Sequence, residues 1–239
     1  LETAVDLRKF SVGNNNLTKL SKDSFAKNAN MTELNFGNKY KTESLSLSKR
    51  SADFGKQLTS SNSFMTLDPE IFSSLVKLKK LDLSSNKIHD FEVVCFLKNL
   101  SKLQLSGNEI SFLPETLSNM ANNLEYLYLG YNKLDRLSCS IAKLSKLKVL
   151  ALNNNKLSEV TSNLKELANL QVFHLHNNSI SSLPRILVDG LPSLKELSLR
   201  NNPLIDKFVR KRFNEGRKHT APSLFELACR TIKMHDIPY

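Results

Sequence analysis

The chain has 239 residues, 40% of them hydrophobic, with only seven glycines and seven prolines, which excludes a low-complexity chain. Its formal net charge is +11, but the lysines are scattered and do not alternate with aromatic residues, as a platform for single-stranded nucleic acid requires. No apolar run reaches the ~18 residues that a membrane-spanning helix needs, so we predict neither nucleic acid nor a membrane as partner.

A polar corner residue recurs every 22 to 24 residues, each time after a short run of alternating leucines. In the clearest copy Leu147, Leu150 and Leu152 precede the corner Asn155, and Leu157 follows it. A fixed period of this length and pattern indicates a leucine-rich repeat solenoid. We predict an α/β fold with about nine repeats in a right-handed curved array, and a parallel sheet on the concave side. The corners are Asn15, Lys39, Asn62, Asn86, Asn108, Asn132, Asn155, Asn178 and Asn202.

Each repeat opens with a strand whose leucines point inward, because side chains alternate across a strand. The asparagine that ends the strand can donate to and accept from backbone groups of neighbouring turns. We therefore expect the stacked asparagines to form a ladder that satisfies buried backbone groups. The second half of each repeat predicts a short irregular or helical convex side.

The first three copies are degraded. Leu34 and Phe36 lead to the corner at Lys39, and Gln57 and Thr59 stand at spine positions before Asn62. Such polar residues are costly to bury without partners, so the alignment there is open to a shift of one residue. The first repeat carries no cap, from which we expect further sequence upstream.

The middle of the predicted concave face carries two large amphipathic residues, Tyr126 and Tyr128, beside the small Ala151. Exposed tyrosines near arginine are typical of protein interfaces. We predict that a protein partner binds there. The candidate contact residues are Tyr126, Tyr128, Asn153, His174, His176 and Arg200.

Two alternatives remain for His174 and His176: solvated side chains, or ligands of a metal. A metal site would need further Cys, Asp or His ligands, and the neighbouring concave positions supply asparagine and serine. We predict no metal, no cofactor and no enzyme activity, since no phosphate loop, nucleophile elbow or Cys-x-x-Cys motif occurs.

After the array (residues 1–204) we expect a capping helix and basic linker (205–219). Ile205, Phe208, Val209 and Phe213 fall on one helical stripe. A cluster of basic residues lies opposite, and it is either the solvated face of this helix or a docking patch for an acidic partner. The cluster consists of Lys207, Arg210, Lys211, Arg212, Arg217 and Lys218.

A second helix is predicted in residues 220–239, where Pro222 stands at a helix start and apolar residues follow at helical spacing. The simpler interpretation is that it packs back on the solenoid. The sharper one is that it looks like an elongin C-binding box, in which leucine anchors a helix in a hydrophobic groove. The residues of this box are Ser223, Leu224, Leu227, Ala228 and Ile232.

The C-terminal half resembles the leucine-rich repeat-containing protein fifty-eight family. The resemblance is carried by Leu124–Gly130, by His176-Asn177-Asn178, by Glu196–Leu204 and by Leu227–Lys233. It implies a substrate-recognition subunit of a cullin-RING ubiquitin ligase in the ubiquitin-like conjugation pathway. The repeats would hold the substrate, and the SOCS-box-like tail helix would recruit elongin C with elongin B, and a cullin. Family members continue beyond this point with a cysteine-rich tail, so the tail helix is expected to be truncated. The alternative is a signalling scaffold in which the tail helix only caps the array.

The cysteines bear on the compartment. Cys95, Cys139 and Cys229 are far apart and odd in number, unlike the disulfide-rich caps of secreted repeat proteins. We therefore expect an intracellular protein, cytoplasmic or nuclear.

Overall fold

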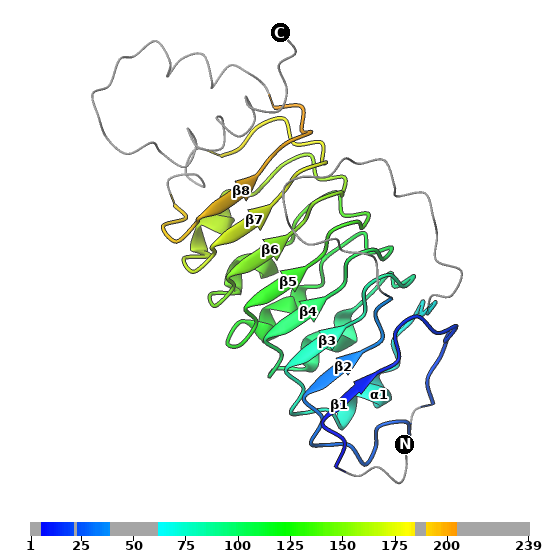
Figure 1. Ribbon diagram of the computed structural model, residues 1–239. Coiled ribbons are helices and arrows are strands. Elements are labelled where there is room, and N and C mark those ends of the chain that lie inside the picture. The colour runs from blue at the N-terminus through cyan, green and yellow to red at the C-terminus, as the bar shows by residue number, and fades with distance from the viewer. Residues whose placement is uncertain (1–5, 22, 39–61, 185–189, 205–239) are drawn as a thin grey trace, which may run out of the picture.

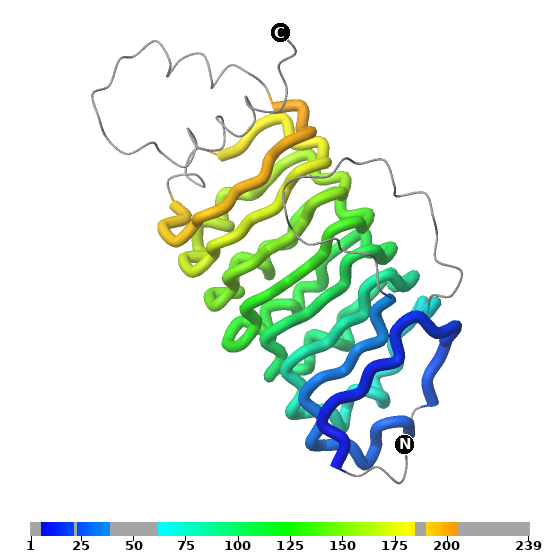
Figure 2. The backbone as a smooth tube through the Cα atoms, viewed as in Figure 1, coloured from blue at the N-terminus to red at the C-terminus, as the bar shows by residue number. Residues whose placement is uncertain are grey.

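The computed structural model describes residues 6–21, 23–38, 62–184 and 190–204. These residues form one parallel sheet of eight strands that pair in chain order, so every crossover joins neighbouring strands (Figure 1). The tube in Figure 2 shows the consequence, a coil in which each turn is one repeat. The strands are β1 (Lys9–Ser11), β2 (Glu33–Asn35), β3 (Lys80–Asp82), β4 (Lys102–Gln104), β5 (Tyr126–Tyr128), β6 (Val149–Ala151), β7 (Val172–His174) and β8 (Glu196–Ser198).

The other side of the coil is made of short helices, which confirms the predicted convex side. Of the five helices in the described residues, four are 3-10 helices of five or six residues, because the tight repeat leaves little chain for a longer helix. The helices are α1 (Pro69–Ser73), η1 (Glu92–Phe96), η2 (Glu115–Met120), η3 (Cys139–Lys143) and η4 (Ser162–Glu166).

The inward side chains of both halves fill the coil as one hydrophobic spine. It runs from Phe25 to Leu199 and consists mostly of leucines with almost no exposed surface. At the N-terminal end aromatic residues replace leucine, and Phe10, Phe25, Phe36 and Phe64 pack with ring centroids 5.4 to 6.4 Å apart. These rings fill the volume that the less regular first repeats leave.

The predicted asparagine ladder is confirmed. The side-chain amide of Asn108 donates to the carbonyls of Leu83 and Leu105 at 3.0 and 2.9 Å, and its oxygen accepts from the backbone of Ile88 at 3.0 Å. The corner asparagines from Asn62 to Asn202 each satisfy at least three backbone groups of neighbouring turns in this way. Because unpaired buried backbone groups are costly, the ladder fixes the distance between repeats.

Asn62 belongs to this ladder, but it completes the repeat that begins with β2. Its amide donates to the carbonyls of Val12 and Phe36 at 2.9 and 3.0 Å, and its oxygen accepts from the backbone of Leu17 at 3.0 Å. Asn62 therefore makes the same set of bonds as Asn108, and the Phe36 carbonyl takes the place that the Leu105 carbonyl has for Asn108. The strands β2 and β3 pair directly, so no strand lies between them.

We predicted about nine repeats, with a separate strand between the corners Lys39 and Asn62. The direct pairing of β2 with β3 leaves no place for that strand in the sheet, and Lys39 itself lies outside the described residues. The described residues form eight repeats, and the second carries residues 39–61 as an insertion about as long as one repeat. The described residues on either side of this segment, Asn38 and Asn62, are joined by two hydrogen bonds. The backbone of Asn62 donates to Asn38 Oδ1 at 2.8 Å, and Asn38 Nδ2 donates to the Asn62 carbonyl at 3.2 Å.

Several predicted features lie outside the described residues. They are the spine positions Phe54, Gln57 and Thr59, the capping helix and basic cluster of residues 205–219, and the tail helix of residues 220–239.

Candidate protein-binding surface

The parallel register arranges the outward side chains of β4 to β8 in rows that run across the concave face. The first row starts each strand, the second ends it, and the third lies two residues further along the chain. The register pairs Lys102 with Tyr126 and carries this alignment through to Glu196. The first row is Lys102, Tyr126, Val149, Val172 and Glu196; the second is Gln104, Tyr128, Ala151, His174 and Ser198; the third is Ser106, Gly130, Asn153, His176 and Arg200.

Tyr126 and Tyr128 lie side by side on β5 and are both partly exposed. The ammonium group of Lys102 lies 5.4 Å from the centroid of the Tyr128 ring, within the range of a cation–π contact. Burial raises the pKa of the Tyr128 phenol, with Tyr126 adding a smaller effect. The pair therefore offers partly exposed apolar surface with neutral hydroxyls, a combination common in interface anchors.

Asn153 covers the backbone at the end of β5. A Cβ atom on Gly130 would lie 2.7 Å from Asn153 Oδ1, so only glycine leaves room for the amide in this position. The side chain of Asn153 therefore lies against the backbone of Gly130, two residues after Tyr128. It presents an amide at the edge of the patch.

The two histidines differ in their surroundings. His174 is only 7% exposed, and its Nε2 lies 2.9 Å from Glu196 Oε1. His176 is partly exposed, with Nδ1 at 3.0 Å from Ser198 Oγ. Burial, followed by the nearby charge of Arg200, lowers the pKa of His176 to about 4, so this ring is neutral at pH 7.

Tyr131 is a surface residue that the sequence pattern did not single out. It stands just before the corner, where the backbone is left-handed (φ 56°), and the other described left-handed residues are asparagine, serine or glycine. Those types tolerate this conformation, whereas a bulky side chain there costs about 1 kcal/mol. Tyr131 is nevertheless 41% exposed, three residues from Tyr128. We add it to the candidate contact residues at the edge of the patch.

In the last repeats the left-handed position before the corner carries asparagines that form a second polar ladder. Asn201 Nδ2 donates to Asn177 Oδ1 at 2.6 Å, and Asn177 Nδ2 donates to Asn154 Oδ1 at 2.9 Å. Asn154 Nδ2 is buried and has no acceptor within the described residues. The ladder stops there because the preceding repeat has Tyr131 instead of a residue with a side-chain carbonyl.

The structure brings Tyr126, Tyr128, Asn153 and His176 together, with Arg200 at the far end of the third row. His174 lies beside Ala151 in the second row and is almost fully buried. The predicted elongin C-binding residues Ser223, Leu224, Leu227, Ala228 and Ile232 lie outside the described residues. Within the described ranges no group of three or more His, Cys, Asp or Glu side chains could hold a metal ion. None of the helices in that part of the chain is long and apolar enough to cross a membrane.

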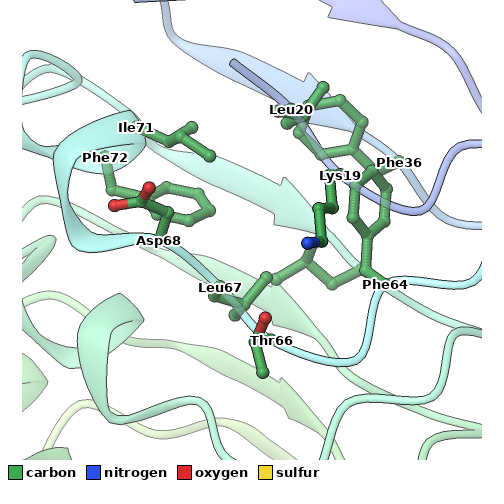
Figure 3. A pocket seen from close by; sticks show the side chains of 10 residues that line it. Lys19, Leu20, Phe36, Phe64, Thr66, Leu67, Asp68, Ile71 and Phe72 are labelled. Atoms are coloured by element: carbon green, nitrogen blue, oxygen red, sulfur yellow. The ribbon is translucent and has the colours of Figure 1, made fainter. Parts of the chain in front are cut away.

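A cavity of about 350 Å³ opens at the N-terminal end of the array, between the loop that contains Lys19 and Leu20 and the helix α1. Figure 3 shows Phe36 and Phe64 on one side and Ile71 and Phe72 on the other, with Lys19 and Asp68 as its charged residues. The lining comes from the spine of the first repeats, where the packing is least regular. The cavity is therefore separate from the concave patch.

Comparison with known proteins agrees with this geometry. A family model described as "Leucine rich repeat" matches residues 57–110, 98–157 and 145–204, which together span more than half of the chain. The chain belongs to the leucine-rich repeat family. It is thus a protein-interaction module of the leucine-rich repeat type.

Leucine-rich repeat proteins of several kinds are similar to it. Internalin C2 of Listeria monocytogenes superposes with a TM-score of 0.62 at 27% identity, covering 81% of this chain and 71% of that one. A leucine-rich repeat protein of Leptospira interrogans gives a TM-score of 0.57 at 27% identity, covering 83% and 56%. Leucine-rich repeat-containing protein 58 of Xenopus tropicalis is 49% identical over 57 residues, which is 24% of this chain and 15% of the relative.

Proposed function

We propose that this leucine-rich repeat array holds a protein partner on its concave face, at the patch formed by Tyr126, Tyr128, Asn153 and His176. The observation that carries the proposal is the neutral, amphipathic character of this patch. The two tyrosines are partly exposed, and the low pKa of His176 keeps its ring uncharged. Charged residues lie at the two ends of the patch, as in interfaces with an apolar centre and a polar rim.

At a finer level, we propose that the chain is the substrate-recognition subunit of an elongin-containing cullin-RING ubiquitin ligase. The repeats would bind the substrate, and the helix with Leu224 and Ala228 would bind elongin C. Two observations support this: the box-like spacing from Ser223 to Ile232, and the 49% identity with part of leucine-rich repeat-containing protein 58. The compartment that fits this role is the cytoplasm or the nucleus.

The second candidate is an intracellular signalling scaffold in which the tail helix only caps the array. It is favoured by the apolar spine, which reaches Leu199 at the end of the described array and must be covered at its last repeat. The two candidates share the concave binding site and differ in the role of the tail.

The concave site is tested by the double variant Tyr128→Ala, His176→Ala. Partners are purified from cells that express the wild-type chain or the variant, and are quantified by mass spectrometry. We expect the main partner to be reduced at least about tenfold, because such anchors typically contribute ~2 kcal/mol each. The matched control is Asn119→Ala, Asn163→Ala, at exposed positions in η2 and η4. Equal recovery of partners with all three chains would contradict the proposal.

The tail is tested by binding of purified elongin B–elongin C complex to the full chain. Leu224→Asp, Ala228→Asp should abolish binding, because a carboxylate at an anchor position cannot enter a hydrophobic groove. If the wild-type chain and this variant bind equally poorly, the ligase proposal fails and the scaffold remains. The thermal midpoint of both chains shows whether the substitutions also uncap the array.

A further inference from the structure

The charged side chains of the concave face are not equivalent, because some are already neutralised by neighbours. Lys9 and Lys80 both reach Glu33, at 3.2 and 2.9 Å, and Lys148 reaches Glu125 at 2.7 Å. These lysines are held in ion pairs that cross from one strand to the next. A partner would have to break those pairs to use them.

Two cations beside the patch are different. Among the described residues, neither Lys102 nor Arg200 forms an ion pair with a carboxylate. The ammonium of Lys102 rests over the Tyr128 ring. The positive charge of Arg200 lies close enough to His176 to help lower the pKa of that ring. Both cations therefore lie beside the patch and are open to a new anion.

The positions of these two cations define a diagonal across the sheet. Lys102 is in the first row on β4, and Arg200 is in the third row, beyond β8. Four strand spacings of ~4.8 Å and four residues of ~3.3 Å along the strand separate them, which gives about 23 Å. The diagonal passes over Tyr128, Ala151 and His176, the neutral centre of the patch.

A segment that lies along this diagonal would meet positive charge at both ends and apolar surface in between. In an extended chain a distance of about 23 Å corresponds to roughly seven residues. Bidentate pairing with a carboxylate also suits the guanidinium group of Arg200. The excess of positive charge on the whole chain, +11, would attract such a segment from a distance.

We propose that the concave face binds an acidic segment of a partner protein, with carboxylates about seven residues apart on Lys102 and Arg200 and an apolar side chain between them on Tyr128 and Ala151. This inference rests on the proposed function, since it names the chemical class of the partner at that same surface. Nucleic acid is the competing polyanion, but the patch between the cations has neutral side chains where successive phosphates would need further positive charge.

The test uses the full chain and a phage-displayed library of random twelve-residue peptides. The wild type should enrich peptides with two acidic positions about seven residues apart around an aromatic or aliphatic residue. A synthetic copy of an enriched peptide should bind Lys102→Glu, Arg200→Glu at least about tenfold more weakly. The milder Lys102→Gln, Arg200→Gln variant should lie between the two, and circular dichroism confirms that each variant is folded.

The matched control is Lys143→Glu, Lys165→Glu, which makes the same change in net charge on η3 and η4 of the convex side. Its affinity for the peptide should be within about twofold of the wild-type value, because its charges act only through the long-range field. Equal weakening in this control would overturn the proposal, because attraction would then come from net charge alone. Enrichment of peptides without an excess of acidic residues would overturn it as well. So would a labelled twelve-nucleotide polyuridine that binds and competes with the peptide.

The experiments distinguish failure of the proposed acidic partner from failure of the concave binding site. If Tyr128→Ala, His176→Ala weakens peptide binding but the charge reversals do not, the acidic class is wrong and the concave site stands. If none of these variants changes binding, the concave site itself is wrong.

Discussion

At the scale of single residues, the edge of the concave patch is unusual because Tyr131 occupies a backbone position where the fold favours a smaller residue. Regular asparagine, serine or glycine would satisfy the left-handed position before each corner, yet Tyr131 stands there (φ 56°). The fold accepts both a strained backbone and the unpaired amide of Asn154. Such local costs often mark positions that serve binding.

Tyr131→Asn should therefore raise the free energy of unfolding by about 1 kcal/mol. The asparagine removes the strain and offers a carbonyl to Asn154 Nδ2, which extends the second ladder by one step. Urea denaturation of the two chains measures the difference. Tyr131→Phe is the control, because it keeps the strain and should leave the stability unchanged. A less stable asparagine variant would show that the tyrosine ring packs usefully where it lies.

His176 predicts a pH dependence of stability. Its pKa is lowered from 6.5 to about 4 in the folded chain, so the folded state binds this proton less readily than the unfolded state. The stability from the neutral ring is complete above about pH 6.5 and is lost as the pH falls towards 4. The pKa values of Glu33 and Glu109 are also lowered, so the stability that these carboxylates contribute is lost only at more acidic pH, below 4.5.

Denaturation between pH 7 and pH 5 isolates this effect. We expect the wild type to lose stability over this range and His176→Gln, which cannot titrate, to lose less. His89→Gln is the control, since His89 lies exposed on the surface. Identical pH curves for wild type and His176→Gln would mean that burial and the charge of Arg200 do not disfavour the protonated ring.

At the scale of elements, the second repeat shows that a regular spacing of corner residues does not always correspond to a separate repeat. The corners at Lys39 and Asn62 lie 23 residues apart, a normal period, and the sequence pattern therefore placed a repeat between them. The direct pairing of Leu34 with Leu81 shows otherwise. Periodicity alone cannot separate a repeat from an insertion of the same length, whereas the hydrogen bonds of Asn62 can.

Deleting residues 39–61 should leave a folded array. The deletion joins Asn38 to Asn62 and creates the regular run Leu34-Asn35-Phe36-Gly37-Asn38-Asn62, in which the ladder asparagine follows directly on the strand. The thermal midpoint should be equal or higher, because Asn38 and Asn62 are already hydrogen-bonded to each other and a shorter connection between them costs less conformational entropy. An unfolded deletion variant would mean that the insertion contributes to the spine. Deleting residues 80–101, which removes one true repeat, is the matched comparison for circular dichroism.

At the scale of the whole molecule, the positive charge and the concave patch act at different distances. The scattered lysines create a long-range field, whereas Lys102 and Arg200 act on contact. We expect the association rate of an enriched acidic peptide to fall steeply as salt rises from about 50 to 300 mM, because the Debye length shortens from about 14 to 6 Å. Surface plasmon resonance measures this rate.

The dissociation rate should change less with salt, since it depends on the apolar contacts with Tyr128 and Ala151. A salt dependence confined to the dissociation rate would contradict this division. The variant Lys143→Glu, Lys165→Glu should slow association slightly and leave dissociation unchanged.

The sequence by itself determined the solenoid, the inward leucines, the asparagine ladder and the place of the tyrosine patch. These follow from local rules, because side-chain alternation and the corner residue repeat with the period of the chain. Only the tertiary structure decided that there are eight described strands, that His174 is buried under Glu196, and that Tyr131 interrupts a polar ladder. Each of these depends on which residues meet across neighbouring turns. That pairing is set by backbone hydrogen bonds between residues distant in sequence, and no local pattern encodes it.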